Sequence, residues 1–160
     1  LVHRLDRDTS GVMVFARNPA AQRHLGLQFE RRHAKKRYVA CVNGCPRERA
    51  GTVALPLIAD WPNRPRQKVD PSRGRAAMTH WRVIGQEPGG HARVALVPET
   101  GRSHQLRVHM RAIGPPILGD PLYGDPACDS MSRMMLHSVM LQLRPPDGGA
   151  ALTFEAPVPF

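Results

Sequence analysis

The sequence predicts an α+β fold in which a mixed, mostly antiparallel sheet carries two helices packed against one face. Three observations favour this fold: several stretches alternate apolar and polar residues, one hairpin signal is clear, and only two stretches have helical periodicity. With 160 residues, of which 41% are hydrophobic, the chain can form one hydrophobic core but hardly two. We therefore expect a single domain over residues 1–160.

The first predicted elements are a buried strand and a helix. Residues 11–16 (Gly-Val-Met-Val-Phe-Ala) form a short apolar run between turn-forming residues, which indicates a buried strand. Asn18 as N-cap and the proline that follows it favour a helix over residues 19–32. Leu25 and Phe29, one helical turn apart, mark its inner face.

The middle of the chain predicts two strands and a proline-rich loop. Residues 36–42 alternate in the manner of a strand, and residues 52–58 indicate another, with a bend or a sheet edge at Pro56. Residues 59–75 are rich in proline. Because proline fixes φ and lacks a hydrogen-bond donor, we expect a loop of limited freedom there and no helix.

The second half of the chain predicts a hairpin, a helix and two more strands. Residues 78–86 and 92–98 alternate with period two around Glu-Pro-Gly-Gly, which is a hairpin signal. A helix is predicted over residues 103–112. Its apolar stripe consists of Leu106, Met110 and Ile113. Residues 136–144 and 152–155 are predicted to complete the sheet.

The composition is strongly basic. The chain has 23 Lys and Arg against 13 Asp and Glu, a formal net charge of +10, and a pI near 10.9. Such a surplus is typical of proteins that bind a polyanion, because each cation placed on a phosphate releases condensed counterions. Nucleic acid is therefore the leading partner, although a general bias toward arginine would produce the same surplus.

Membrane and metal functions are not indicated. No stretch approaches the roughly 18 consecutive apolar residues of a membrane span, and no secretory signal opens the chain, so we expect a cytoplasmic protein without membrane contact. The odd number of cysteines favours reduced thiols. A zinc site from Cys41 and Cys45 with Cys128 or His137 is an alternative, but the spacing is not that of a zinc knuckle and we expect no metal.

A first cluster of charged residues precedes the first predicted strand. In residues 4–11 (Arg-Leu-Asp-Arg-Asp-Thr-Ser-Gly), Asp6 lies between two guanidinium groups. Opposite charges nearby favour the ionised carboxylate, and an ionised carboxylate can act as a nucleophile or a base. The alternative is that Asp6 only neutralises its neighbours.

A second polar cluster lies where the second predicted helix begins. Residues 99–109 (Glu-Thr-Gly-Arg-Ser-His-Gln-Leu-Arg-Val-His) place Arg102 where it can bind a carboxylate or phosphate with two hydrogen bonds. His104 and His109 are five residues apart and do not share a helix face. A metal site that uses both histidines is therefore not expected.

Two basic segments combine cations with an aromatic ring. In residues 35–38 (Lys-Lys-Arg-Tyr) the ring of Tyr38 can stack on a flipped base, or simply lie half-buried on a strand. In the proline-rich loop, Trp61 can stack on a base while nearby cations bind phosphates, unless the loop is merely solvated. These cations include Arg64, Arg66 and Lys68.

Four motifs follow one another along the chain. They are residues 3–6 (His-Arg-Leu-Asp) with 9–11 (Thr-Ser-Gly), 36–40 (Lys-Arg-Tyr-Val-Ala), 101–109, and 119–124 (Gly-Asp-Pro-Leu-Tyr-Gly). In order and approximate spacing they resemble the RluA family of pseudouridine synthases. Residues 55–69 further resemble the branch of that family that modifies both 23S rRNA and the tRNA anticodon stem-loop.

The resemblance implies an RNA-modifying isomerase with the catalytic-domain fold of these enzymes. The N1–C1′ bond of a uridine is broken, the base rotates, and it is rejoined through C5, without a cofactor or metal. The uridine must leave its stack for this, which costs a few kcal/mol and less in a loop. We expect a monomer that acts on rRNA, tRNA or both.

The resemblance also implies roles for single residues. Asp6 is the catalytic aspartate, which either attacks the nucleotide or removes a sugar proton. Tyr38 stacks on the base and is a candidate acceptor of the C5 proton, Arg102 pairs with Asp6 and holds it ionised, and Arg4 fills the gap left by the extruded base. The residues expected to bind RNA are Arg4, Trp61, Arg64, Arg66, Lys68, His104 and Arg107.

Two alternatives and one departure accompany this interpretation. A non-catalytic RNA-binding module needs the basic surface but not Asp6. A glycosidase built on Asp6 with Asp8 or Glu99 uses paired carboxylates, but it leaves the charge of +10 unexplained. Family members carry an upstream segment with a Lys-Pro motif, so the chain is expected to be a fragment whose sheet has an exposed edge.

Overall fold

The computed structural model describes residues 1–125 and 131–160. Its strands are β1 (Ser10–Gly11), β2 (Lys35–Val42), β3 (Ala50–Val53), β4 (Leu57–Ala59), β5 (Gln67–Val69), β6 (Thr79–Glu87), β7 (His91–Pro98), β8 (Leu136–Leu143) and β9 (Leu152–Glu155). Its helices are α1 (Pro19–Glu30) and α2 (Gln105–Ala112), with short 3₁₀ turns at Trp61–Asn63 and Pro88–Gly90.

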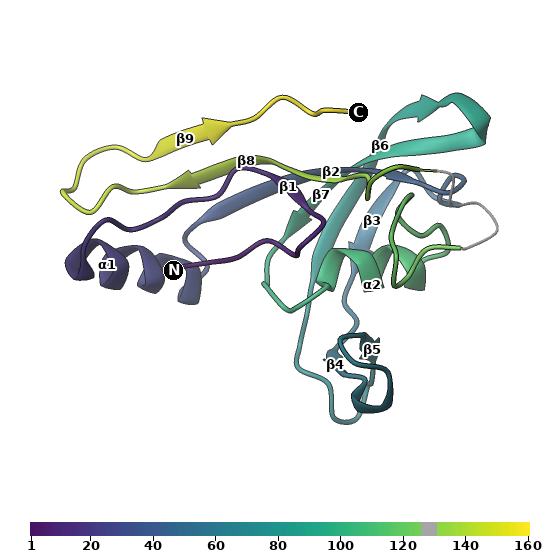
Figure 1. Ribbon diagram of the computed structural model, residues 1–160, viewed down its shortest axis with the longest axis horizontal. Coiled ribbons are helices and arrows are strands. Elements are labelled where there is room, and N and C mark those ends of the chain that lie inside the picture. Colours follow the sequence, from purple (N-terminus) through teal and green to yellow (C-terminus); the bar gives the residue numbers. More distant parts are fainter. Residues whose placement is uncertain (126–130) are drawn as a thin grey trace.

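Within the described residues, a seven-stranded sheet runs in the order β1-β8-β2-β7-β6-β3, with β9 also paired to β8. The β1–β8 pair is parallel, and the other pairs are antiparallel. Both helices lie on the same side of this sheet (Figure 1). The predicted α+β class with a mostly antiparallel sheet is therefore confirmed.

Helix α1 forms as its N-terminal signal predicts. The Asn18 side chain caps it by accepting a hydrogen bond from the backbone N–H of Ala21 at 2.8 Å. Leu25, on the inner face, is buried. The helix ends at Glu30, two residues earlier than predicted, and Arg32 just beyond it has the left-handed backbone (φ 59°) that ends many helices.

The first predicted strand is shorter and less buried than expected. Residues 11–16 were predicted as a buried strand, but β1 has only two residues and ends at Gly11. Here β1 and β8 approach so closely that a Cβ on Gly11 would lie 2.2 Å from the carbonyl oxygen of Ser138. Beyond Ser138, β8 pairs with β9 on that edge. Residues 12–16 consequently follow no regular ladder, and Phe15 is 62% exposed.

Pro56 divides the predicted strand over residues 52–58 into two strands of different sheets. β3 pairs with β6 in the main sheet, whereas β4 turns away, pairs with β5, and forms one further bridge from Leu57 to Arg75. The segment predicted as a loop over residues 59–75 therefore contains a strand and a 3₁₀ turn. We call residues 57–69 the projecting hairpin, because they extend from the body of the molecule (Figure 1).

Helix α2 starts at Gln105, two residues later than predicted, since His104 before it is left-handed (φ 53°). Its apolar stripe packs into the main core with β2, β6 and β7. The other side of the helix is also covered, so that Arg107 is only 2% exposed. A buried arginine needs buried partners, and these partners define the site.

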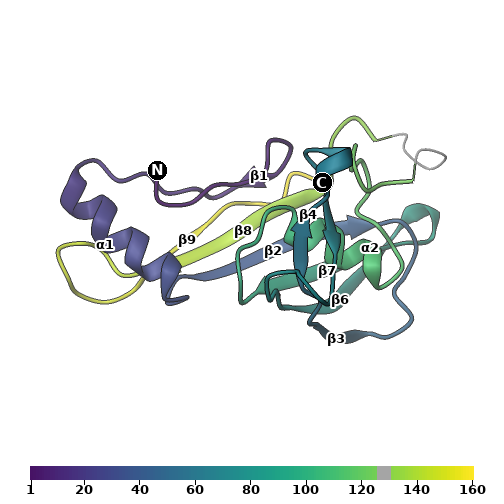
Figure 2. The ribbon, with the colours of Figure 1, turned by 90° about the horizontal axis from the view of Figure 1, so that it is seen from below.

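Three hydrophobic clusters hold these parts together. The main cluster lies between the sheet and α2, and a second lies beneath α1. A third joins the projecting hairpin to α2 through Leu57, Ala77, Val108 and Tyr123. Seen from below, α1 and α2 lie toward opposite ends of one face of the molecule (Figure 2). Neither helix of the described part has the length and hydrophobicity of a membrane span.

Candidate active site

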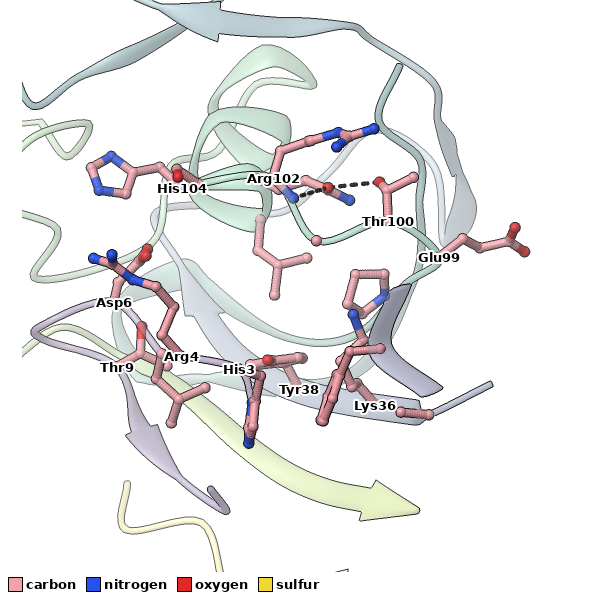
Figure 3. Close-up of a pocket in the computed structure, with 18 of the residues that line it drawn as sticks. His3, Arg4, Asp6, Thr9, Lys36, Tyr38, Glu99, Thr100, Arg102 and His104 are labelled. Atoms are coloured by element: carbon pink, nitrogen blue, oxygen red, sulfur yellow. Dashed lines mark hydrogen bonds between the residues drawn. The ribbon is translucent and has the colours of Figure 1, made fainter. Parts of the chain in front are cut away.

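A pocket of about 530 Å³ opens between the N-terminal segment, the end of α1, the start of β2 and the loop before α2. This volume lies in the usual range of small-molecule sites, roughly 300–1,000 Å³. Asp6 and Thr9 lie on one side of the pocket, and Thr100 and Arg102 on the other (Figure 3). Five of the residues predicted from the sequence line it: Arg4, Asp6, Tyr38, Arg102 and His104.

Asp6 offers a partly accessible carboxylate to this pocket. A turn fixes its backbone, because the N–H of Thr9 donates to the carbonyl oxygen of Asp6 at 3.0 Å. Its side chain is 21% exposed, and Arg107 Nη1 donates to its Oδ2 at 3.4 Å. The ion pair joins the N-terminal segment to α2, 101 residues further along the chain.

The expectation that Arg102 pairs with Asp6 is wrong. Arg102 Nε donates to the carbonyl oxygen of Ala76 at 3.1 Å, and its guanidinium points away from Asp6 (Figure 3). The left-handed residue His104 separates it from the helix. Arg107 follows within the first turns of α2, on a side that faces inward, and so takes the place expected for Arg102.

Arg107 is oriented by a second carboxylate, Asp120. Arg107 Nε donates to Asp120 Oδ2 at 2.8 Å and Nη2 donates to Oδ1 at 2.6 Å, the bidentate geometry that fixes a guanidinium plane. Burial raises the pKa of Asp120, but the hydrogen bonds and charge of Arg107 outweigh it and lower that pKa. Arg107 was predicted to bind RNA. It is instead buried, and its guanidinium pairs with the carboxylates of Asp6 and Asp120.

Tyr38 contributes its ring from β2. The pairing of β2 with β8 shifts register between Arg37 and Tyr38, and such a bulge re-aims the side chain that follows it. Burial raises the pKa of the phenol, a hydrogen bond with Ser138 opposes this, and the negative charge of Asp6 raises it further. The phenol is therefore protonated at neutral pH.

Cations crowd one side of the pocket. Burial lowers the pKa of Lys36, and the positive charge of Arg32 lowers it further. The pKa of Arg102 is also lowered, first by burial and then by the charges of Arg75 and Arg32. Lys36, Arg102, Arg32 and Arg75 all line the pocket, and positive charge gathered in this way attracts a polyanion.

The projecting hairpin carries a second group of cations. Trp61 is 64% exposed, and the Arg64 guanidinium lies 3.8 Å from its ring centroid, a cation–π contact. Lys68 pairs with Asp60 at 3.6 Å. Arg66 differs, because it points inward and donates to the carbonyl oxygen of Leu122. The exposed side of the hairpin therefore offers an aromatic ring with cations.

Residues 1–112 match the protein family described as RNA pseudouridylate synthase. The chain belongs to this family. The Dual-specificity RNA pseudouridine synthase RluA of Escherichia coli (strain K12) is 52% identical over 160 residues, which are 99% of this chain and 73% of that protein. The protein of the same name from Pasteurella multocida (strain Pm70) is 48% identical over 159 residues, 99% of this chain and 73% of that protein.

Solved structures agree. Human RNA Pseudouridylate Synthase Domain Containing 1 superposes with a TM-score of 0.87 at 31% identity, over 99% of this chain and 69% of that one. Human RNA Pseudouridylate Synthase Domain Containing 4 gives a TM-score of 0.81 at 28% identity, over 99% and 71% of the two chains. This pseudouridine synthase is thus an RNA-modifying isomerase, as its motifs predict.

Acid is expected to destabilise this pseudouridine synthase between pH 6.5 and about 4. Burial, helped by the charge of Lys36, lowers the pKa of His3 from 6.5 to about 4, and its Nε2 accepts the N–H of Val14 at 2.9 Å. Burial also lowers the pKa of His109. The unfolded chain then binds more protons, so stability present above pH 6.5 is lost as pH falls toward the folded-state pKa.

The denaturation midpoint, measured at steps across this range, checks the prediction. Each such histidine contributes at most about 1.4 kcal/mol per pH unit. His3→Gln keeps an acceptor for Val14 and should flatten the dependence; a midpoint that does not change with pH would contradict the argument.

The described residues contain no cluster of three His, Cys, Asp or Glu side chains that could hold a metal ion. Cys41 is a buried free thiol and Cys45 an exposed one. Cys128, which the zinc alternative also named, lies outside the described residues.

Sequence reasoning did not find two residues of this site. Asp120 and Tyr123 belong to the motif of residues 119–124, which carries the family resemblance but received no role. Both are buried, at 2% and 4% exposure. The sequence feature that could have pointed to them is a carboxylate and a phenol three residues apart in a short loop bounded by glycines. Nothing local in the sequence shows that they contact α2.

Proposed function

We propose that this enzyme converts uridine to pseudouridine in RNA loops, with 23S rRNA and the tRNA anticodon stem-loop as its substrates, and that Asp6 is the catalytic residue. One observation carries the proposal: a partly exposed carboxylate, paired with a buried arginine, lies in a pocket lined with cations. The similarity to relatives named dual-specificity synthases supports both substrate classes.

The reaction needs little besides positioning. The N1–C1′ bond breaks, the base turns, a C5–C1′ bond forms, and the proton lost from C5 is balanced by one gained at N1. None of this can occur inside a stack, so the uridine must enter the pocket flipped out. Asp6 then either attacks the nucleotide or removes a sugar proton, while Arg107 steadies its charge.

Two further residues serve the flipped base. Tyr38 stacks on it, and the raised pKa of the phenol favours this role over acceptance of the C5 proton. Arg4 is exposed and lines the pocket, which suits it to occupy the space that the base leaves in the RNA.

RNA binding rests on charge and stacking at two places. Cations around the pocket bind phosphates close to the target uridine. Trp61, Arg64 and Lys68 on the projecting hairpin bind the RNA further away, and His104 contacts it at the pocket. We also propose that the enzyme works as a monomer in the cytoplasm.

Tritium release from RNA labelled at C5 of uridine tests the proposal directly. An anticodon stem-loop or a 23S rRNA hairpin should release one tritium per modified uridine, whereas a fully paired duplex of the same composition should release almost none. RNA binding without release would favour the non-catalytic module. Release of free uracil or sugar would favour a glycosidase.

A further inference from the structure

The motif of residues 119–124 contacts both the catalytic pair and the projecting hairpin. Asp120 holds Arg107 through two hydrogen bonds, and its Oδ1 also accepts the backbone N–H groups of Leu122 and Tyr123, at 2.9 and 3.0 Å. One carboxylate therefore fixes the orientation of Arg107 and the position of Tyr123. A displacement of either residue strains the hydrogen bonds of the other.

The projecting hairpin depends on Tyr123 for its position. β4 and β5 form a separate two-stranded sheet, and an isolated hairpin is only marginally stable in water. Leu57 and Val69 pack in a small cluster that contains Tyr123, and the N–H of Gln67 donates to the Tyr123 hydroxyl at 2.7 Å. Arg66 adds a hydrogen bond to the carbonyl oxygen next to Tyr123.

The ring of Tyr123 lies near one cation of the catalytic pair and one cation of the projecting hairpin. The guanidinium of Arg107 is 5.0 Å from the ring centroid, and that of Arg66, on the hairpin, is 5.7 Å away. Both distances fall within the roughly 6 Å of cation–π contacts. The ring thus touches the arginine of the catalytic pair and an arginine that precedes β5.

The hydroxyl of Tyr123 makes the most direct connection. It accepts the N–H of Gln67 and forms a second hydrogen bond, with His104 Nδ1, at 2.7 Å. His104 lines the pocket and stands immediately before α2, the helix that carries Arg107. This hydroxyl therefore joins a backbone group of the hairpin to the start of the catalytic helix.

We propose that Tyr123 is a positioning residue through which RNA bound on the projecting hairpin aligns the Arg107–Asp6 pair for reaction. The proposal rests on the function proposed above. The exposed side of the hairpin meets RNA at a distance from the uridine, and its inner side meets Tyr123. Binding energy gained there is then used to align the reacting groups, and so appears in the rate of the chemical step as well as in affinity.

The test compares two RNAs with the wild-type enzyme and with Tyr123→Phe, which removes one hydroxyl and keeps the ring. The first RNA is a stem-loop that reaches the hairpin; the second is a short single strand around the same uridine. Single-turnover tritium release at saturating RNA reports the chemical step. We expect Tyr123→Phe to slow tritium release from the stem-loop roughly five- to tenfold, the scale of one lost hydrogen bond. Release from the short strand should slow less than about twofold.

A second variant, Trp61→Ala, tests whether RNA contact at the hairpin acts on the reaction through Tyr123. It weakens the hairpin contact with RNA and should slow the stem-loop reaction in the wild-type background at saturating RNA. In the Tyr123→Phe background it should slow the reaction little further, because the hydroxyl that joins Gln67 to His104 is already missing. Additive effects of the two substitutions would overturn the proposal.

The remaining outcomes are equally decisive. Equal losses on both RNAs would show that Tyr123 only supports the fold near the pocket, and an unchanged rate on the stem-loop would show that the hydroxyl transmits nothing. Either result overturns the inference while the wild-type enzyme stays active. A wild-type enzyme that releases no tritium from any RNA would instead overturn the proposed function.

Discussion

Asp6→Asn is expected to abolish pseudouridine formation while RNA binding stays nearly intact. The amide has the shape of the carboxylate but cannot act as a nucleophile or accept a proton. The pocket cations and the projecting hairpin, which carry the RNA affinity in our proposal, are unchanged. Tritium release should fall by at least about 10³-fold, since general acid–base or nucleophilic groups contribute on this scale.

Asp8→Asn provides the matched control for this prediction. Asp8 is an exposed carboxylate two residues away and is not among the residues that line the pocket. It should keep its activity, and filter binding should give Kd values within about threefold of wild type for both variants, because removing a negative charge costs no phosphate contact. Substantial activity in Asp6→Asn, or an equal loss in Asp8→Asn, would remove Asp6 from its proposed role.

Local signals predicted most elements of the fold correctly. The cap at Asn18 predicted α1, and the Glu-Pro-Gly-Gly turn predicted the hairpin of β6 and β7. Both signals act between neighbours in the sequence, and the structure satisfies them locally. The short β1 could not be predicted in this way, because its length depends on β9, which competes for the same edge of β8.

The projecting hairpin shows the same limit. Its prolines indicated a stiff loop, and Pro56 does mark a break in the chain. What makes residues 57–69 a docked hairpin, however, is the contact of Gln67 and Leu57 with Tyr123, more than fifty residues away. Such contacts between distant residues leave no periodic trace in a single sequence.

The sequence also predicted only some of the site residues, because others are placed by contacts between distant residues. Asp6 and Tyr38 line the pocket together as expected, because each lies in a motif with a distinctive order of residue types. Arg102 and Arg107 are both arginines of one motif, five residues apart. Which of them pairs with Asp6 is decided by the left-handed His104 between them and by Asp120, and neither effect is visible in the spacing.

Arg107→Lys is expected to cost both activity and stability. An ammonium group cannot make the bidentate contact with Asp120 and still reach Asp6, because it lacks the planar fork of the guanidinium. Asp120 is then left buried and poorly paired. Breaking a buried ion pair costs about 3–5 kcal/mol of folding free energy. That is a large share of the roughly 5–15 kcal/mol that stabilises a typical domain.

The activity loss has a separate cause. Without Arg107 the charge of Asp6 is no longer held at the pocket, so tritium release at saturating RNA should fall by about 10²-fold or more, as for other electrostatic contacts in active sites. Asp120→Asn should reproduce a large part of both effects, since it removes the charge that orients Arg107. Chemical denaturation measures the loss of stability, and single-turnover tritium release measures the loss of activity.

Arg102→Lys is the matched comparison, because it changes the other arginine of the motif in the same way. Arg102 donates to a single backbone carbonyl and is partly exposed, so its replacement should lower the unfolding free energy by less than about 1 kcal/mol. If Arg102→Lys costs more activity than Arg107→Lys, then Arg102 serves Asp6 as the motif alone predicted. The inward orientation of Arg107 and its contacts with Asp6 and Asp120 argue for the opposite order.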